Sequence, residues 1–168
     1  ANYGSPIVFL FFGGFVMALA LEKVNLHRRI ALNIIRLTGT TPNKVILGFM
    51  IATASLSMWI SNTASTVVML PIALSVLNLL VDDADGFTKN DQNFALSVML
   101  GIAFSANAGG IATVIGTPPN SVLIGLLENE YNTEISFLKW MTIGLPFSII
   151  MVGICYLVLV KWMFPNRD

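Results

Sequence analysis

The chain has 168 residues, of which 55% are hydrophobic and only 11% charged, whereas a soluble domain carries roughly 25% charged residues. The composition therefore predicts an all-α integral membrane protein, and the balance of nine Lys and Arg against nine Asp and Glu leaves no basic field for nucleic acid. The single cysteine, Cys155, and the single histidine, His27, exclude an internal disulfide, Cys-rich metal sites and multi-histidine motifs. A hydrophobic span begins close to Ala1 with no signal peptide before it, so we expect a piece of a larger membrane protein.

Four stretches of the chain contain no charged residue, and their lengths predict the membrane elements. They are residues 1–21, 45–81, 92–127 and 140–160. A spanning helix needs about 20 apolar residues, so the first and last stretches fit one span each. The two middle stretches are too long for one span and too short for two with a loop. Each also has polar residues and Gly or Pro near its middle, which is typical of re-entrant hairpins and broken helices at transporter binding sites.

The connection over residues 22–44 is the most basic one, which places it in the cytoplasm. Within it, residues 24–37 alternate basic and apolar positions at helical spacing, which favours a helix on the membrane surface over an ordinary basic loop. His27 lies among these basic residues and is expected to be solvated rather than catalytic. If 45–81 enters and leaves the membrane from the cytoplasm, the acidic segment 128–139 lies outside and the basic C-terminus returns inside, as the positive-inside bias requires.

The centre of the 45–81 stretch is the run Ser57-Met58-Trp59-Ile60-Ser61-Asn62-Thr63. Helices on its two sides would have about 16 residues, or ~24 Å, so the tip of this hairpin should stop inside the bilayer. Ser61, Asn62 and Thr63 are good N-cap residues, so the second arm can begin near Ala64 and direct its free N–H groups at the tip. The first arm would end near Ile60 with free carbonyl groups. One place would then offer donors for an anion and oxygens for a cation.

A second polar run, Asn107-Ala108-Gly109-Gly110-Ile111-Ala112-Thr113-Val114-Ile115-Gly116-Thr117-Pro118-Pro119-Asn120, interrupts the 92–127 stretch. Its glycines, at positions 109, 110 and 116, permit unwound backbone whose carbonyls a bound ion could satisfy. Thr117 and Pro118 restart a helix with a preferred cap and first-turn residue. The Gly-Lys-Ser/Thr ending of a phosphate-binding P-loop is missing.

Further helix starts are expected at four N-cap candidates: Ser5 before Pro6, Thr41 before Pro42, Asp91, and Ser136, which would open a closing helix over 137–163. Either polar run, taken alone, could be a kink that serves helix packing. Two runs of matching design favour a binding site. Such a site can hold a carboxylate without Arg or Lys, because fixed dipoles, hydroxyls and a co-bound cation suffice.

The Ser61-Asn62-Thr63 and Gly116-Thr117-Pro118-Pro119-Asn120 runs closely resemble the divalent-anion:sodium symporter family, and the resemblance covers essentially the whole chain. It implies half of an inverted-repeat transporter, the N-terminal repeat, with the second repeat of the same protein missing. Residues 1–44 would be a scaffold transmembrane helix and a cytoplasmic interfacial helix. Residues 45–168 would be half of the transport domain, with the hairpin at 45–81, the broken helix at 92–127 and the closing helix at 137–163.

The resemblance also implies a site. Sodium (Na+) would be bound by oxygens of Ser57, Ser61, Asn62 and Gly116. One substrate carboxylate would contact Ser61, Asn62 and Thr63, with Thr117 and Pro118 lining the pocket. A second sodium and the second carboxylate would use the missing repeat.

By the same resemblance, the function is sodium-coupled symport of C4 dicarboxylates (succinate, malate, fumarate) by a homodimer with an elevator mechanism, in the multi-pass inner (plasma) membrane. Alternatives within the family are a sodium-independent dicarboxylate exchanger and a sulfate or citrate carrier. Outside it, a serine hydrolase using Ser61 lacks a base within reach, so no enzyme is expected. A structural subunit would not explain two facing capped breaks. A channel is a further alternative, although loops with an anion end and a cation end favour a carrier with bound states.

Overall fold

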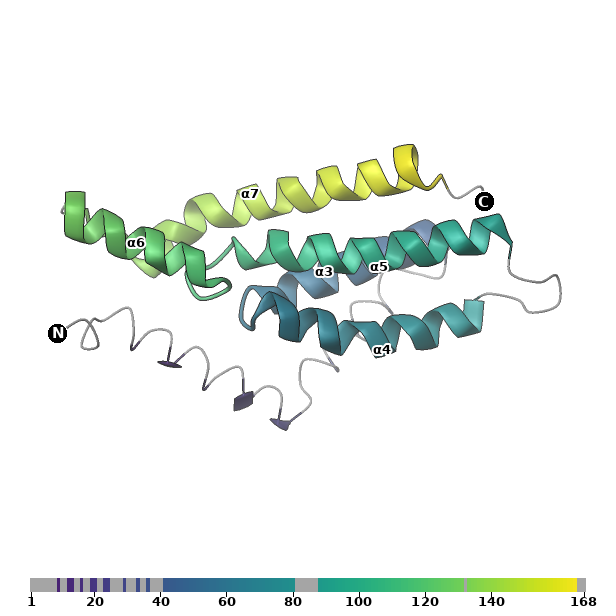
Figure 1. Ribbon diagram of the computed structural model, residues 1–168, viewed down its shortest axis with the longest axis horizontal. Coiled ribbons are helices and arrows are strands. Elements are labelled where there is room, and N and C mark those ends of the chain that lie inside the picture. The colour runs from purple at the N-terminus through teal and green to yellow at the C-terminus, as the bar shows by residue number, and fades with distance from the viewer. Residues whose placement is uncertain are drawn as a thin grey trace.

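A computed structural model describes residues 41–80, 88–131 and 133–165 of the chain, with isolated positions between residues 9 and 36. In these ranges the regular structure is helical and contains no strand. The elements are α3 (Pro42–Ser57), α4 (Asn62–Leu80), α5 (Lys89–Gly110), α6 (Pro118–Tyr131), α7 (Phe137–Leu157) and the π-helical turn η3 (Val158–Met163) (Figure 1). The span expected over 1–21, the surface helix expected over 24–37, His27 and the Ser5 cap lie outside the continuously described ranges.

The break expected in the middle of residues 45–81 is present, because two helices are joined there by a tight turn. Helix α3 has 16 residues and α4 has 19, which at 1.5 Å per residue gives lengths of about 24 and 29 Å. Neither exceeds the ~30 Å hydrocarbon core, as arms of a hairpin should not. Residues 58–60 form a turn, so α3 ends somewhat before Ile60, and α4 begins at Asn62 rather than near Ala64.

The interruption expected within 92–127 is also present, because residues 111–117 are not helical and separate α5 from α6. The role expected of Gly109 and Gly110 is wrong, since both belong to the last turn of α5. Only Gly116 lies in the unwound stretch. Gly109 instead lets α5 touch α3, because an added Cβ there would collide with the backbone of Ala54.

The N-cap expected at Asp91 is wrong as well. Thr88 is the N-cap of α5, and Asp91 is the third helical residue of a capping box with it. The Thr88 hydroxyl and backbone N–H donate to the Asp91 carboxylate and hold the pKa of that carboxyl below its usual range. Ser136 caps α7 as expected, with its hydroxyl accepting from Lys139 N–H.

Thr41 is extended and precedes Pro42 in the first turn of α3, although its side chain makes no capping hydrogen bond. The proline therefore sets the start of this helix, since its fixed φ suits the first helical position and the missing N–H would be unpaired there anyway.

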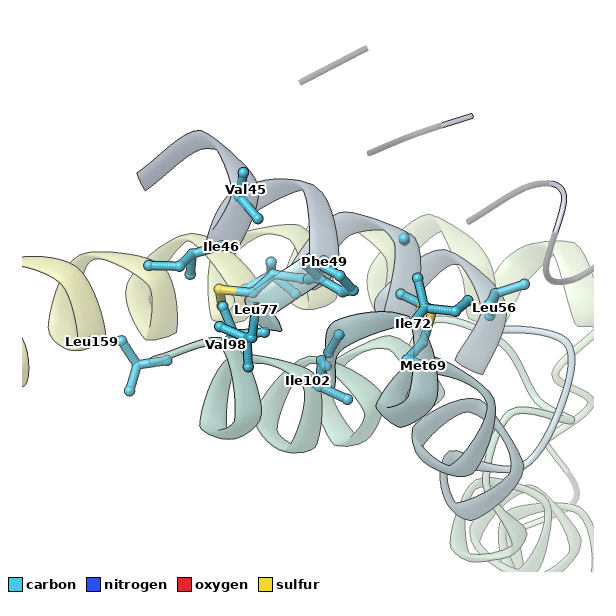
Figure 2. Close-up of a cluster of buried hydrophobic side chains, with 14 of the residues drawn as sticks. Val45, Ile46, Phe49, Leu56, Met69, Ile72, Leu77, Val98, Ile102 and Leu159 are labelled. Carbon is cyan, nitrogen blue, oxygen red and sulfur yellow. The ribbon is translucent and has the colours of Figure 1, made fainter. Parts of the chain in front are cut away.

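Helix α5 is the central element: α4 and α7 lie on opposite sides of it, and α3 packs behind it and contacts all three (Figure 1). The buried apolar side chains form one cluster between α3, α4, α5 and the end of α7 with η3. Figure 2 shows its main members, which are Val45, Ile46, Phe49, Leu56, Met69, Ile72, Leu77, Val98, Ile102 and Leu159. This cluster fixes the hairpin against α5, and so holds the hairpin tip beside the end of that helix.

Among the described helices, only the continuous stretch Phe137–Met163 is long and apolar enough to cross a membrane by itself. Its bounds are those expected for the closing helix. Only 22% of its most apolar window is buried, so most of its apolar surface faces outward.

Replacing Gly109 with alanine is expected to destabilise the pair formed by α3 and α5, because the new Cβ would meet rigid backbone at Ala54. Overpacking of this kind costs about 1–3 kcal/mol of unfolding free energy. The matched control is Gly153→Ala in α7, where the added Cβ meets no atom within 4 Å and helix propensity improves. Thermal unfolding in detergent should show a lower melting temperature for the first variant alone, and equal melting temperatures would refute this packing.

Candidate functional site

The hairpin tip, residues 57–63, and the unwound stretch 111–117 lie against each other at the end of α5. Ser57, the last residue of α3, is fully buried, and its hydroxyl contacts both α4 and α5. The hairpin tip and the end of α5, which are about 50 residues apart in sequence, therefore form one polar centre.

Three oxygens meet at Ser57. Its Oγ lies 2.6 Å from Asn62 Oδ1 and 2.6 Å from the Ala106 carbonyl oxygen. A serine hydroxyl has one proton, so it can donate to only one of these two acceptors at a time. The centre thus holds more oxygen lone pairs than protons, which is the donor set of a site for a hard cation such as sodium.

Glycines allow the backbone to pack closely beside this centre. An added Cβ at Gly110 would collide with Asn62 Oδ1, and one at Gly116 would lie 2.5 Å from the Gly110 carbonyl oxygen. Both glycines are buried. Of the expected sodium ligands, Ser57 and Asn62 are in direct contact. Gly116 packs against the backbone of Gly110, which in turn packs against the Asn62 side chain.

Thr113 connects the two polar runs. Its hydroxyl is buried, donates to the Met58 carbonyl oxygen in the hairpin tip at 2.5 Å, and accepts from Gly116 N–H at 3.0 Å. One side chain thus pairs a carbonyl left free where α3 ends with an N–H left free by the unwound stretch. This bond fixes the position of Gly116 relative to the hairpin.

Asn120 and Trp140 secure the unwound stretch from its other sides. The Asn120 Nδ2 group donates to the carbonyls of Gly110 at 3.0 Å and Thr113 at 2.8 Å. The Trp140 indole of α7 donates to the Ile111 carbonyl at 3.0 Å. Irregular backbone that is buried in a membrane protein needs such partners, because the hydrocarbon core offers no water to replace them.

The start of α4 supplies hydrogen-bond donors that could bind an anion. Ser61 is the N-cap, since its Oγ accepts from Ala64 N–H at 3.2 Å and its carbonyl accepts from Ser65 N–H at 3.0 Å. The first N–H groups of a helix have no partner within it, and among the described residues those of Asn62 and Thr63 have none elsewhere. These groups, with the positive end of the helix dipole, suit a carboxylate.

The start of α6 is a poorer donor. Its first two residues, Pro118 and Pro119, have no N–H group, and Asn120 N–H bonds to the Thr117 carbonyl. Thr117 is half-buried and Pro118 is exposed, as is Thr63. Within the described ranges no hydrogen bond joins Ser61 or Thr63 to Thr117 or Pro118. The contacts with substrate that are expected of these four residues remain predictions.

Sequence reasoning placed Asn107, Thr113 and Asn120 in the second polar run without giving them a role. Their signal was present, because each is a hydrogen-bonding residue in a charge-free membrane segment. The described residues hold no group of three or more His, Cys, Asp or Glu that could bind a metal ion. A cation here would be bound by neutral oxygens alone.

A sequence profile for citrate transporters matches residues 1–168, the whole chain. The chain belongs to the citrate transporter family. It is also 44% identical, over 161 residues, to the sodium-dependent dicarboxylate transporter SdcS of Staphylococcus aureus, with the same values for strains USA300, NCTC 8325 and COL. The aligned part is 95% of this chain and 31% of SdcS, so the chain spans about a third of the length of the curated relatives it matches.

Membership of the citrate transporter family confirms the resemblance to divalent-anion:sodium symporters and identifies the chain as a membrane protein of a transporter family rather than an enzyme. The two polar runs that suggested the family are the same two runs that meet in the structure. The sequence signature and the polar centre therefore coincide.

Substituting Thr113 with valine is expected to uncouple the two runs, because it leaves the Met58 carbonyl and the Gly116 N–H without partners. Each unpaired buried group costs about 1–3 kcal/mol of unfolding free energy. Thr113→Ser keeps the hydroxyl and should lose far less. Melting temperatures in detergent compare the two variants, and a valine variant as stable as the serine variant would exclude this role for the hydroxyl.

Proposed function

We propose that the chain forms part of a sodium-coupled secondary carrier of C4 dicarboxylates such as succinate, malate or fumarate. The observation that carries the proposal is the surplus of oxygens at Ser57, where one hydroxyl proton faces two acceptors at 2.6 Å. The name of the relative SdcS supports both the ion and the substrate class.

In this proposal sodium is bound by oxygens of Ser57, Ser61, Asn62 and Gly116. Of these, Ser57 Oγ and Asn62 Oδ1 are already in contact, and Gly116 is close to Gly110 beside them. A monovalent cation held by neutral oxygens can bind and leave readily, as a transport cycle requires. A permanent positive side chain at membrane depth would be costly and would retain the anion.

The dicarboxylate would place one carboxylate at the start of α4, against Ser61, Asn62 and Thr63, with Thr117 and Pro118 at the pocket wall. The free N–H groups of Asn62 and Thr63 supply donors, and the nearby cation neutralises charge. Sodium bound first would order Ser61 and Asn62, which both ligands share. Coupling of the two ligands would follow from these shared residues.

The remaining parts of the proposal concern the whole protein. The chain would supply one of two inverted repeats, and the other repeat would bind the second sodium and the second carboxylate. Residues 1–44 would belong to the scaffold and 45–168 to the moving transport domain. The full-length protein would work as a homodimer by an elevator motion in the multi-pass inner (plasma) membrane.

Citrate is the second candidate substrate, because the matching family profile is that of citrate transporters. Sulfate transport and sodium-independent dicarboxylate exchange are the remaining alternatives. Each predicts a different effect of anions and of sodium on the melting temperature.

Thermal unfolding of the purified full-length protein tests the proposal. A ligand at 100 times its dissociation constant stabilises the folded state by about 2.7 kcal/mol. We expect succinate to raise the melting temperature in sodium chloride and not in choline chloride. Stabilisation by succinate that is equal in both salts would replace symport by exchange, and stabilisation by citrate or sulfate alone would change the substrate. Stabilisation by none of the three anions would contradict the proposed carrier.

A further inference from the structure

Asn62 is held by a second asparagine that sequence reasoning left without a role. Its Nδ2 donates to Asn107 Oδ1 at 3.0 Å, across from α4 to α5. The Asn107 Nδ2 in turn donates to the Ala103 carbonyl oxygen at 3.3 Å, one turn earlier in its own helix. These two hydrogen bonds form a short chain from Ala103 through Asn107 to Asn62, at the proposed sodium site.

We infer that Asn107 is a positioning residue that turns the Asn62 oxygen toward sodium. The inference rests on the proposed function and concerns the orientation of one amide. Asn107 itself lies one residue from the Ala106 carbonyl that completes the oxygen centre, yet its own side chain points to Asn62 and to its own helix.

The direction of both hydrogen bonds is set by the Ala103 carbonyl oxygen. A backbone carbonyl only accepts, so Asn107 must turn its NH2 group to Ala103 and present its oxygen to Asn62. That oxygen also only accepts, so Asn62 must present its own NH2 group. The Asn62 oxygen is then left facing Ser57 Oγ at 2.6 Å, and Gly110 on its other side.

Without Asn107, the Asn62 amide has no such constraint. With its NH2 group turned toward Ser57, it would donate a hydrogen bond to that hydroxyl, and two N–H protons would occupy the place of a cation. The Asn107 side chain is exposed in the structure, so its replacement leaves the buried cluster of α3, α4 and α5 untouched.

The test uses sodium-dependent succinate uptake by the full-length protein in proteoliposomes, measured against sodium concentration at saturating succinate. Asn107→Leu has a similar volume and no hydrogen-bonding group, and Asn107→Ala provides a smaller variant should leucine impair folding. Either should raise the half-saturating sodium concentration by about three- to tenfold, the usual worth of one lost hydrogen bond. The melting temperature without sodium should stay unchanged, which separates positioning from a purely structural role.

Asn107→Asp keeps an acceptor for Asn62 whether or not the carboxyl is protonated, so it should keep the half-saturating sodium concentration at or below that of the parent. Asn90→Ala, at an exposed position near the other end of α5, is the matched control and should change nothing.

An unchanged sodium requirement in both apolar variants would overturn the inference, and so would an aspartate variant as impaired as they are. If succinate uptake by the parent protein does not depend on sodium, the proposed function itself is overturned, and the inference with it. The parent measurement therefore distinguishes the two failures.

Discussion

Replacing Asn62 with alanine is expected to reduce sodium-driven dicarboxylate uptake by about 100-fold or more. The substitution removes the Oδ1 atom that meets Ser57 and the Nδ2 group that bonds to Asn107. Asn62 is also assigned to both proposed ligands, and hydrogen bonds to charged groups contribute about 1.5–3 kcal/mol each, so two such losses give this factor. Uptake by the full-length protein in proteoliposomes measures the loss.

Asn78→Ala is the matched control for this variant, because Asn78 is exposed near the opposite end of the same helix. It should transport as the parent does. The alanine variant at position 62 should still fold, since the buried apolar cluster does not include this residue. Folded protein that transports with unchanged sodium dependence would remove Asn62 from the site.

The second large effect is expected for Gly116→Ala, which should lower uptake by about two orders of magnitude. An added Cβ would lie 2.5 Å from the Gly110 carbonyl oxygen and 2.9 Å from its Cα. Because these are backbone atoms, the unwound stretch must move away from α5, and a shift of about 1 Å in a preorganised site has an effect of this order.

The control for this variant is Gly153→Ala, which introduces the same methyl group into open space in α7. Sodium-dependent stabilisation should be measured beside uptake, because a folded Gly116→Ala protein should have lost it. A variant that folds and keeps the parent's response to sodium would show that Gly116 is not close to the cation.

The hairpin and the broken helix could be predicted from the sequence because their signals are local. A charge-free stretch of unsuitable length for simple spans, with N-cap residues at its middle, specifies a break whatever the rest of the fold does. Hence the bounds of α3, α4 and the closing helix Phe137–Met163 lie close to the expected ones.

The individual hydrogen bonds that join the hairpin tip to α5 and to the unwound stretch could not be predicted, because they depend on how α5 packs against α3 and α4. The bond from Ser57 to the Ala106 carbonyl joins residues 49 apart, and that from Thr113 to Met58 joins residues 55 apart. Spacing in the sequence carries no signal for either. For the same reason Gly109 was assigned to unwound backbone, whereas it is needed for the close approach of α5 to Ala54.

The expected cap at Asp91 failed for a different physical reason. Aspartate suits both the N-cap and the third helical position, and Thr88, three residues earlier, completes a capping box that uses both side chains. The pattern of a threonine followed three residues later by an acidic side chain was present in the sequence and gives the correct start.

The most direct test of the account is succinate uptake into proteoliposomes by the full-length protein, with and without an inward sodium gradient. We predict uptake that follows the gradient and disappears when choline replaces sodium, because in the proposed mechanism a cation fills the oxygen centre at Ser57 and Asn62 before the carboxylate binds. Uptake of the same rate and extent in the absence of sodium would contradict this account.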